Sequence, residues 1–356
     1  MKIIGIEEHF WPQYFIDYFQ ARKKYPRIER VLDESGQKTW RWWDSSEEYH
    51  PWLPDISISK LCDIEGRLRD MDETGIDMLV LSFNPPVDEF DAAEGTALYQ
   101  KVNDIIALSV KKYPDRFASF TSLFLKDPRA AADELERAVR QLGFKGAMIL
   151  PHVEGEYIDA KKYWPVFESA ARLHVPVYIH PQFPPRERLK LYSGYPELIG
   201  PMWGYPAETG FAALRLICSG IFDEYPSLQI ILGHMGESLP FWLPRFDRSW
   251  NSLRGHTLLT NREIAEGADA RPLAEKIKNP PSYYIKNNFF VTISGMFWQP
   301  ALQFVCSAIG ADRVLFAIDS PFESSKVAVQ FIESVSIPDG DKEKICHLNT
   351  EQLFNL

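Results

Sequence analysis

The sequence predicts an α/β protein whose parallel strands close into a distorted (β/α)8 TIM barrel, with an aromatic-rich insertion after the first strand. Three observations support this: eight short apolar segments recur along the 356 residues, helical patterns separate most of them, and the apolar runs are unbroken. Strands of a parallel barrel are covered on both faces and need such runs. Neither GxGxxG nor GxxxxGK[ST] is present, so a nucleotide-binding fold has no support. We expect residues 1–356 to form a single domain.

The expected strands are rich in branched and aromatic residues and are bounded by Gly, Pro or charged residues. They are 3–10, 77–83, 117–124, 146–150, 175–179, 228–232, 289–293 and 315–319. Between them, apolar residues recur at helical spacing. Asp127 followed by Pro128 has the preferred order for the start of a helix. Pro321 indicates that the last strand ends just before it.

Composition excludes several kinds of partner. There are 39 Lys and Arg against 49 Asp and Glu, a net charge of −10, and no basic stripe, so nucleic acid is not expected. No apolar run approaches the roughly 20 residues of a membrane span, and Glu7 and Glu8 interrupt any signal-peptide core. No CxxC pair occurs among the four scattered cysteines, which favours a reducing, cytoplasmic location. They are Cys62, Cys218, Cys306 and Cys346.

The segment 11–57 follows the first strand and is expected to be irregular. It is unusually rich in aromatic residues, which are Trp11, Tyr14, Phe15, Tyr18, Phe19, Trp40, Trp42, Trp43, Tyr49 and Trp52. So long an insertion with so much ring surface indicates a lid or a wall of a ligand pocket. A subunit interface is the alternative, because exposed aromatic residues would otherwise promote aggregation.

Several expected strands end in residues that bind metals. On the first strand, alternation puts the side chains of Glu7 and His9 on the same side. His180, His234 and Asp319 follow three later strands. Each histidine taken singly is more often a core or loop residue, but the carboxyl ends of barrel strands meet at one mouth. Imidazole and carboxylate together suit one Zn²⁺ or Mn²⁺ with positions left for water or substrate.

Motifs at these strand ends resemble those of the amidohydrolase superfamily, in its nonoxidative decarboxylase branch and nearest to the gamma-resorcylate (2,6-dihydroxybenzoate) decarboxylases. The resemblance covers most of the chain outside 11–57 and 248–285. It is clearest in Ile6-Glu7-Glu8-His9-Phe10, Tyr178-Ile179-His180-Pro181, Ile231-Leu232-Gly233-His234-Met235-Gly236-Glu237 and Asp319-Ser320-Pro321-Phe322-Glu323. Strand four offers no metal-bridging lysine, which fits one metal ion, and Ser320 stands where relatives often have Tyr or Trp.

The resemblance implies site residues. It implies metal ligands at Glu7, His9, His180 and Asp319, with His234 and Glu237 as a pair that supports the ligands or takes part in catalysis. Asp319 would donate a proton to the ring carbon that carries the carboxylate, and His234, oriented by Glu237, would polarise or deprotonate the phenol. Candidates for binding the substrate are Arg67, Arg245, Phe10 and Asn84. For either arginine, a surface or interface ion pair is the alternative reading.

These residues lead to a functional prediction with two alternatives. We expect a metal-dependent decarboxylase of hydroxybenzoate-type acids that uses one Zn²⁺ or Mn²⁺ and no organic cofactor, and that assembles as a homodimer or homotetramer. One alternative is a hydrolase or hydratase on the same barrel, acting on a lactone or a muconate-type acid. The other is a catalytically silent barrel that serves as a binding or assembly module, with the aromatic insertion as its interface.

Overall fold

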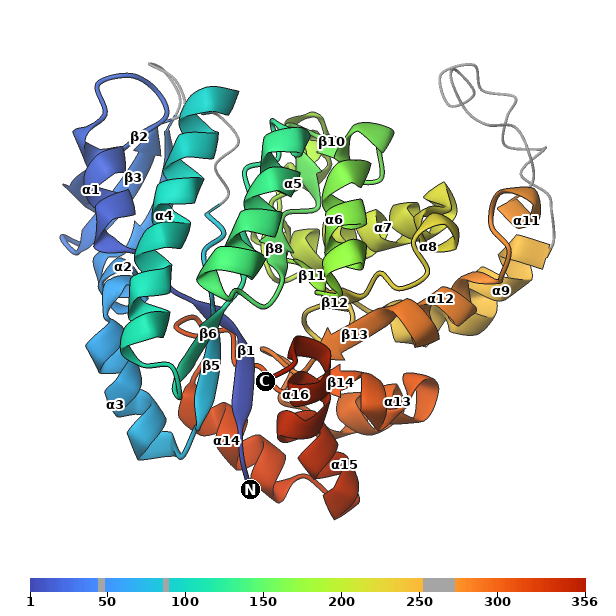
Figure 1. Cartoon of the computed structure of the whole chain (residues 1–356). Helices are drawn as coiled ribbons and strands as arrows, with labels where there is room; N and C mark the ends of the chain where they lie inside the picture. Colours follow the sequence, from blue (N-terminus) through green and yellow to red (C-terminus); the bar gives the residue numbers. More distant parts are fainter. Residues whose placement is uncertain (44–48, 86–89, 252–272) are drawn as a thin grey trace.

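A barrel of parallel strands forms the centre of the protein (Figure 1). The structure is a computed structural model and describes residues 1–43, 49–85, 90–251 and 273–356. The barrel strands are β1 (Ile4–His9), β5 (Met78–Ser82), β6 (Phe117–Ser119), β7 (Thr121–Ser122), β8 (Ala147–Ile149), β11 (Val177–Ile179), β12 (Ile230–Leu232), β13 (Phe289–Thr292) and β14 (Val314–Leu315). Phe120 alone separates β6 from β7, so these two form the third of the eight predicted strands.

The strands are ordered around the barrel as they are along the chain. One ladder runs β1-β5-β6, and the other runs from β7 through β8, β11, β12 and β13 to β14. Beyond β14 the chain pairs with β1: Asp319 N donates to Glu7 O at 3.0 Å, and His9 N donates to Ser320 O at 2.8 Å. These bonds close the cylinder along a line that we call the seam. The predicted barrel is therefore confirmed.

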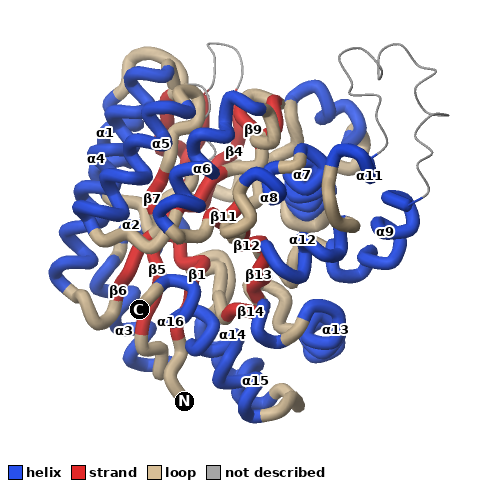
Figure 2. Tube along the Cα trace, turned by 45° about the vertical axis from the view of Figure 1, so that its right-hand side comes forward, coloured by secondary structure: helices blue, strands red, loops and turns tan. Residues whose placement is uncertain are grey.

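Helices surround the barrel, as Figures 1 and 2 show. They are α2 (Asp55–Cys62), α3 (Ile64–Thr74), α4 (Ala92–Lys112), α5 (Pro128–Arg137), α6 (Trp164–Leu173), α7 (Gly204–Ser219), α8 (Ile221–Glu224), α9 (Leu243–Asn251), α11 (Leu273–Lys276), α12 (Pro281–Asn288), α13 (Gln299–Ile309), α14 (Ser325–Ser334), α15 (Asp339–Glu343) and α16 (Asn349–Phe354). Asp127 caps α5 by accepting from Ala130 N, with Pro128 in the first turn, as predicted. No helix in the described ranges has both the length and the apolar character of a membrane span.

Inward side chains fill the barrel as a packed core. Phe120 and Tyr178 lie edge to face with ring centroids 5.9 Å apart, and Phe354 from α16 contacts Phe120 at 5.5 Å. These residues belong to a buried cluster that is separate from the larger one outside the strands. Such interdigitated packing leaves little room for the strands to shift. The barrel is thus a rigid support for the side chains at its carboxyl mouth.

The insertion after β1 is folded, and the prediction of an irregular segment is wrong. It contains α1 (Gln13–Ala21) and an antiparallel sheet of β2 (Arg27–Leu32), β3 (Lys38–Trp43) and β4 (Tyr49–Pro54). Trp42 packs against Phe19 with ring centroids 4.5 Å apart, and Phe15 packs against Phe83 at the end of β5. These rings form a core that attaches the insertion to the barrel. Residues 44–48 and the side chains of Tyr49 and Trp52 lie outside the described set.

Candidate active site

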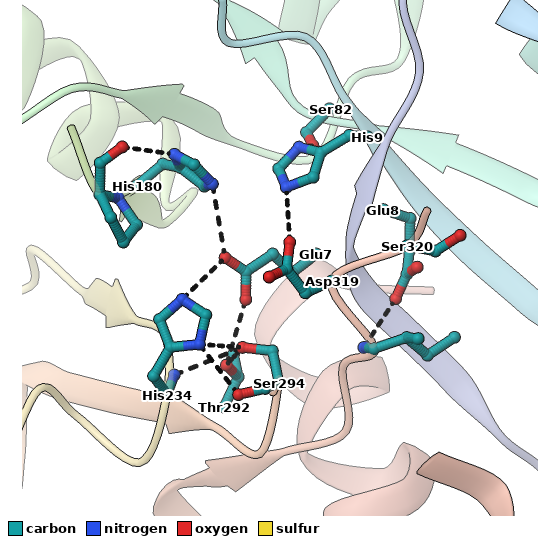
Figure 3. Close-up of polar contacts among 12 residues, drawn as sticks. Glu7, Glu8, His9, Ser82, His180, His234, Thr292, Ser294, Asp319 and Ser320 are labelled. Atoms are coloured by element: carbon teal, nitrogen blue, oxygen red, sulfur yellow. Dashed lines mark hydrogen bonds and ion pairs between the residues drawn. The ribbon is translucent and has the colours of Figure 1, made fainter. Parts of the chain in front are cut away.

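Four of the predicted side chains converge at the carboxyl mouth of the barrel (Figure 3). Glu7, His9, His180 and Asp319 each offer one ligand atom, and these atoms all lie within 4.8 Å of one another. His9 Nε2 is 3.0 Å from Asp319 Oδ1, and His180 Nε2 is 3.8 Å from Glu7 Oε1. β1 and the segment that follows β14 supply three of the four residues, so the seam runs through the group.

Neighbouring groups fix the orientation of both imidazoles. Ser82 Oγ lies 3.0 Å from His9 Nδ1, and His180 Nδ1 donates to the Pro181 carbonyl at 2.8 Å. The Nε2 atoms are therefore the ones turned toward the carboxylates. A hydrogen bond to the outer ring nitrogen is the usual way in which proteins orient a metal-binding histidine. Asp319 itself has φ of 76°, a left-handed conformation that is uncommon outside glycine and typical of functional sites.

Burial and the surrounding charges set the protonation of these groups. Burial lowers the pKa of His9 to about 4 and that of His180 to about 3, so both rings are neutral at pH 7. For Glu7, burial alone would raise the pKa, but the histidines around it outweigh burial, chiefly His234, and the pKa falls below its usual value. Neutral imidazoles and an ionised carboxylate are the forms that bind a cation.

The group has the properties of a site for one divalent cation. Glu7 Oε1 is fully buried, and no hydrogen-bond donor among the described residues reaches it. An unpaired carboxylate oxygen in the interior is costly unless a cation lies beside it. Two imidazole nitrogens and two carboxylate oxygens are a donor set that suits Zn²⁺ or Mn²⁺. The residues present therefore fit the metal ion that the sequence predicts.

His234 lies beside this group but is not one of the four. Its Nε2 is 3.8 Å from Glu7 Oε1, and its Nδ1 donates to the Ser294 carbonyl at 2.9 Å. Burial acts to lower the pKa of His234, but the charges of Glu7 and Glu237 outweigh it and raise the pKa to about 9. The predicted role of Glu237 in orienting this ring stays a prediction, and its charge contributes to the raised pKa of His234. The Nδ1 hydrogen bond goes to the carbonyl of Ser294, a residue that was not among the predicted site residues.

Glu237 is a buried carboxyl group in a strained loop. Burial raises its pKa to about 7, and its Oε1 has no hydrogen-bond partner among the described residues. Every residue from 234 to 238 has a positive φ, which four non-glycine residues adopt at a cost. The backbone after β12 is therefore held in an unfavourable conformation that presents His234 and Glu237 next to the four converging residues.

The four predicted substrate-binding residues lie in different environments. Asn84 is buried at the end of β5 and hydrogen bonds to His9, whose pKa this contact acts to raise. Phe10 is buried in the hydrophobic core. Arg245 is exposed on α9, and its guanidinium lies 5.9 Å from the centre of the Trp242 ring. Arg67 is buried. None of these four placements tests whether the residue concerned binds substrate. Their substrate-binding roles stay predictions.

Arg67 joins the two sides of the seam. Its Nη2 donates to the His9 carbonyl at 2.5 Å, and its Nη1 donates to Ser320 Oγ at 3.2 Å. Glu8, on the same side of the seam as His9, accepts from Ile318 N at 3.0 Å. Burial raises the pKa of the Glu8 carboxyl well above its usual range, and the charge of Arg67 opposes that rise. Arg67 and Glu8 thus hold the backbone on which three of the four converging residues are mounted.

Replacing Arg67 by Met should reduce the free energy of unfolding by about 3 kcal/mol, because buried acceptors on both sides of the seam lose their donor. The double variant with Glu8→Gln should recover part of this loss, since less charge is then left unpaired. Denaturant unfolding measures both. Arg69→Met on the same helix removes only an exposed ion pair to Asp63 and should change stability by under about 0.5 kcal/mol. Equal effects at the two arginines would contradict this role for Arg67.

Fold and site together are those of a metal-dependent barrel enzyme, with one group of residues at its carboxyl mouth that can hold a divalent ion. A sequence model of the amidohydrolase family matches residues 9–356, and the chain belongs to this family. It is 39% identical over 307 residues to a gamma-resorcylate decarboxylase of Polaromonas sp. strain JS666, covering 84% of this chain and 89% of that relative. The resemblance identified in the sequence is thereby confirmed.

Solved structures of decarboxylases are also similar to this chain. A 2,6-dihydroxybenzoate decarboxylase complexed with 2,6-dihydroxybenzoate superposes with a TM-score of 0.80 at 33% identity, covering 100% of both chains. A dihydroxybenzoic acid decarboxylase from Polaromonas sp. JS666, with bound manganese and the inhibitor 2-nitroresorcinol, has a TM-score of 0.80 at 34% identity. It covers 100% of this chain and 97% of that one. The barrel fold is thus shared over the full length with enzymes of known ligands.

Proposed function

We propose that this chain is a metal-dependent, nonoxidative decarboxylase of hydroxybenzoate-type aromatic acids, as its relatives are named. The observation that carries the proposal is the convergence of Glu7, His9, His180 and Asp319 within 4.8 Å, beside His234 and Glu237. We assign the first four as ligands of one divalent ion. Bound there, the ion would supply the positive charge that holds and stabilises the carboxylate and the ortho oxygen of the substrate.

The difficulty of the reaction lies in accommodating the electron pair that the departing CO₂ leaves on the ring. The ring carbon that bears the carboxylate must take up a proton, which forms a C–H bond at the expense of the aromatic system. When the bond to the carboxylate breaks, its electron pair restores the ring and CO₂ leaves. A positioned acid is therefore the main contribution that side chains can make, and its expected effect is about 10²–10⁴-fold in rate.

Asp319 is the acid that we assign to this step. Burial, with the nearby Glu7 charge, raises the pKa of Asp319 well above its usual range, which favours the protonated form. His234 Nε2 faces the same space, because its Nδ1 is bonded to Ser294. With a pKa of about 9 the ring is protonated at pH 7, so Nε2 can donate a hydrogen bond to the oxygen of the substrate phenol and polarise it. After CO₂ leaves, Asp319 regains its proton from solvent.

The finer properties are proposals too. We propose Mn²⁺ or Zn²⁺ as the ion, a homodimer or homotetramer as the assembly, and a cytoplasmic location. We also propose that residues 1–356 act as one domain and that no organic cofactor takes part. The manganese in a dihydroxybenzoic acid decarboxylase supports the choice of ion, and the four free cysteines of this chain support the location.

The test is CO₂ release from 2,6-dihydroxybenzoate by the purified chain loaded with Mn²⁺ or Zn²⁺. In D₂O, the resorcinol product should carry one deuterium at the carbon that held the carboxylate. Bicarbonate should support the reverse carboxylation of resorcinol. The proposal fails if the protein releases no CO₂ from any ortho-hydroxybenzoate. If labelled oxygen from water then enters a lactone or muconate-type substrate, the hydrolase or hydratase alternative takes its place.

A further inference from the structure

A cavity lies at the amino-terminal end of the barrel, opposite the mouth that holds the four converging residues. It lies between α16 and the residues at which β12 and β14 begin: Arg313 directly precedes β14, whereas Asp319 follows it. The cavity has a volume of about 350 Å³, which is enough for a small organic molecule. Six of the residues that line it are Gln229, Phe290, Asp312, Arg313, Asn349 and Leu353. None of them has a role in the function proposed above.

Arg313 gives this cavity a positive charge. Its Nη1 donates to Gln229 Oε1 at 3.1 Å, and its guanidinium lies 4.7 Å from the centre of the Phe290 ring. These contacts fix the plane of the guanidinium without neutralising it, because neither the amide nor the ring is charged. No carboxylate among the described residues forms an ion pair with Arg313. The adjacent Asp312 opposes the lowering of the Arg313 pKa by burial, but its carboxylate is paired with Lys344 at 2.8 Å.

The helix α16, which lies beside β14 in Figure 1, supplies a hydrogen-bond acceptor and an apolar wall. Asn349 Nδ2 donates both of its hydrogens, to the carbonyls of Ala311 and Val314, at 2.8 Å each. Asn349 is only 7% exposed, yet its Oδ1 accepts from no donor in the described part of the chain. Buried amide oxygens are usually paired, so this one is available to a bound hydroxyl group. Leu353 and Phe290 provide the apolar surface.

We propose that this cavity is a second ligand site, separate from the candidate active site, for a small aromatic carboxylic acid that carries a hydroxyl group. The carboxylate would pair with Arg313, whose planar fork of donors matches it. The ring would pack against Leu353 and Phe290, and the hydroxyl would donate to Asn349 Oδ1. Phosphate fits less well, because the cavity offers one guanidinium beside apolar side chains, with the carboxylate of Asp312 also in its wall.

The test uses 3-hydroxybenzoate, which has the carboxylate, the ring and a hydroxyl but lacks the ortho oxygen that we assign to the metal. Its binding to metal-loaded full-length protein is measured by isothermal titration calorimetry. Arg313→Met should weaken this binding about 10–100-fold, as expected for a lost hydrogen bond between charged groups. Glu7→Gln, which alters the opposite mouth, should bind like the parent. So should the matched control Arg140→Met, which removes an exposed guanidinium paired with Glu136.

Two further measurements keep the proposal testable if Arg313→Met does not fold. Gln352 lines the cavity and is exposed on α16, so Gln352→Glu should fold and should weaken binding about fivefold by placing a negative charge beside the bound carboxylate. The uncharged 3-hydroxybenzyl alcohol should bind the parent at least about tenfold more weakly than the acid.

Binding that remains in Glu7→Gln and is lost in Arg313→Met supports the second site. The proposal is overturned if the parent binds no 3-hydroxybenzoate, if Glu7→Gln abolishes all binding, or if Arg313→Met and Gln352→Glu bind it like the parent. These outcomes do not depend on the proposed function. A parent that binds 3-hydroxybenzoate in this way but releases no CO₂ from any ortho-hydroxybenzoate would contradict the proposed function alone.

Discussion

Replacing Asp319 by Asn should lower kcat for decarboxylation about 10³-fold, the loss expected when a positioned acid is removed. Asn has nearly the same shape but cannot deliver a proton to the ring carbon. The carboxylate also lies 3.0 Å from His9 Nε2 at the centre of the site, so a change in metal content is expected as well. Initial rates of CO₂ release, divided by the metal bound per chain, separate the two effects.

Asp312→Asn is the control for that variant. Asp312 precedes the same strand at the opposite end of the barrel and is paired with Lys344 on the surface. This variant should keep the parental rate. A decarboxylation rate per bound metal ion in Asp319→Asn within tenfold of the parent would show that another group donates the proton.

Glu7→Gln should abolish tight metal binding, and with it activity and the stabilisation by metal. Glu7 is 0% exposed and lies between His180 and His234, so its charge is hard to replace. An ion that binds only the folded state stabilises it by about 2.7 kcal/mol at a hundred times its dissociation constant. Calorimetry with Mn²⁺ and with a chelator should show this increment in the parent and its absence in Glu7→Gln.

The matched control for this charge removal is Glu154→Gln, an exposed carboxylate paired with Lys126. It should retain the full response to Mn²⁺. An equal increase in stability on adding Mn²⁺ to Glu7→Gln and to the parent would place the metal elsewhere and would remove the basis of the proposed function.

The barrel and the converging residues could be predicted because both depend on local pattern. Unbroken apolar runs are characteristic of strands covered on both faces, and the eight that the sequence contains correspond to the barrel strands. Alternation along β1 places Glu7 and His9 together, and parallel strands bring His180 and Asp319 to the same mouth. Strand direction and period suffice to predict that these residues meet at one mouth, whereas the separation of His234 from the four ligands rests on the family resemblance.

Contacts between distant residues could not be predicted in the same way. Thr292 and Ser294 are ordinary strand and loop residues, and only the folded barrel places them between Glu7 and His234. Arg67 has the spacing of a helix residue near a site, but its partners lie in β1 and in the segment that follows β14. The regular structure of the insertion, in contrast, had a local pattern that could have predicted it. Trp40 and Trp42 in β3 are buried while the residues around them are half-exposed. That alternation is a strand signal that the aromatic content obscured.

Metal binding would also affect the stability of the barrel, because the ligands lie on both sides of the seam. Between β14 and β1 the ladder is reduced to one isolated bridge, Glu8 to Ser320, and Glu7 and His9 lie on one side of it with Asp319 on the other. An ion shared by these ligands would cross-link the first and last strands of the chain. The free energy of cation binding and the free energy of closing the cylinder would then be linked, so that catalytic competence and resistance to unfolding rise and fall together.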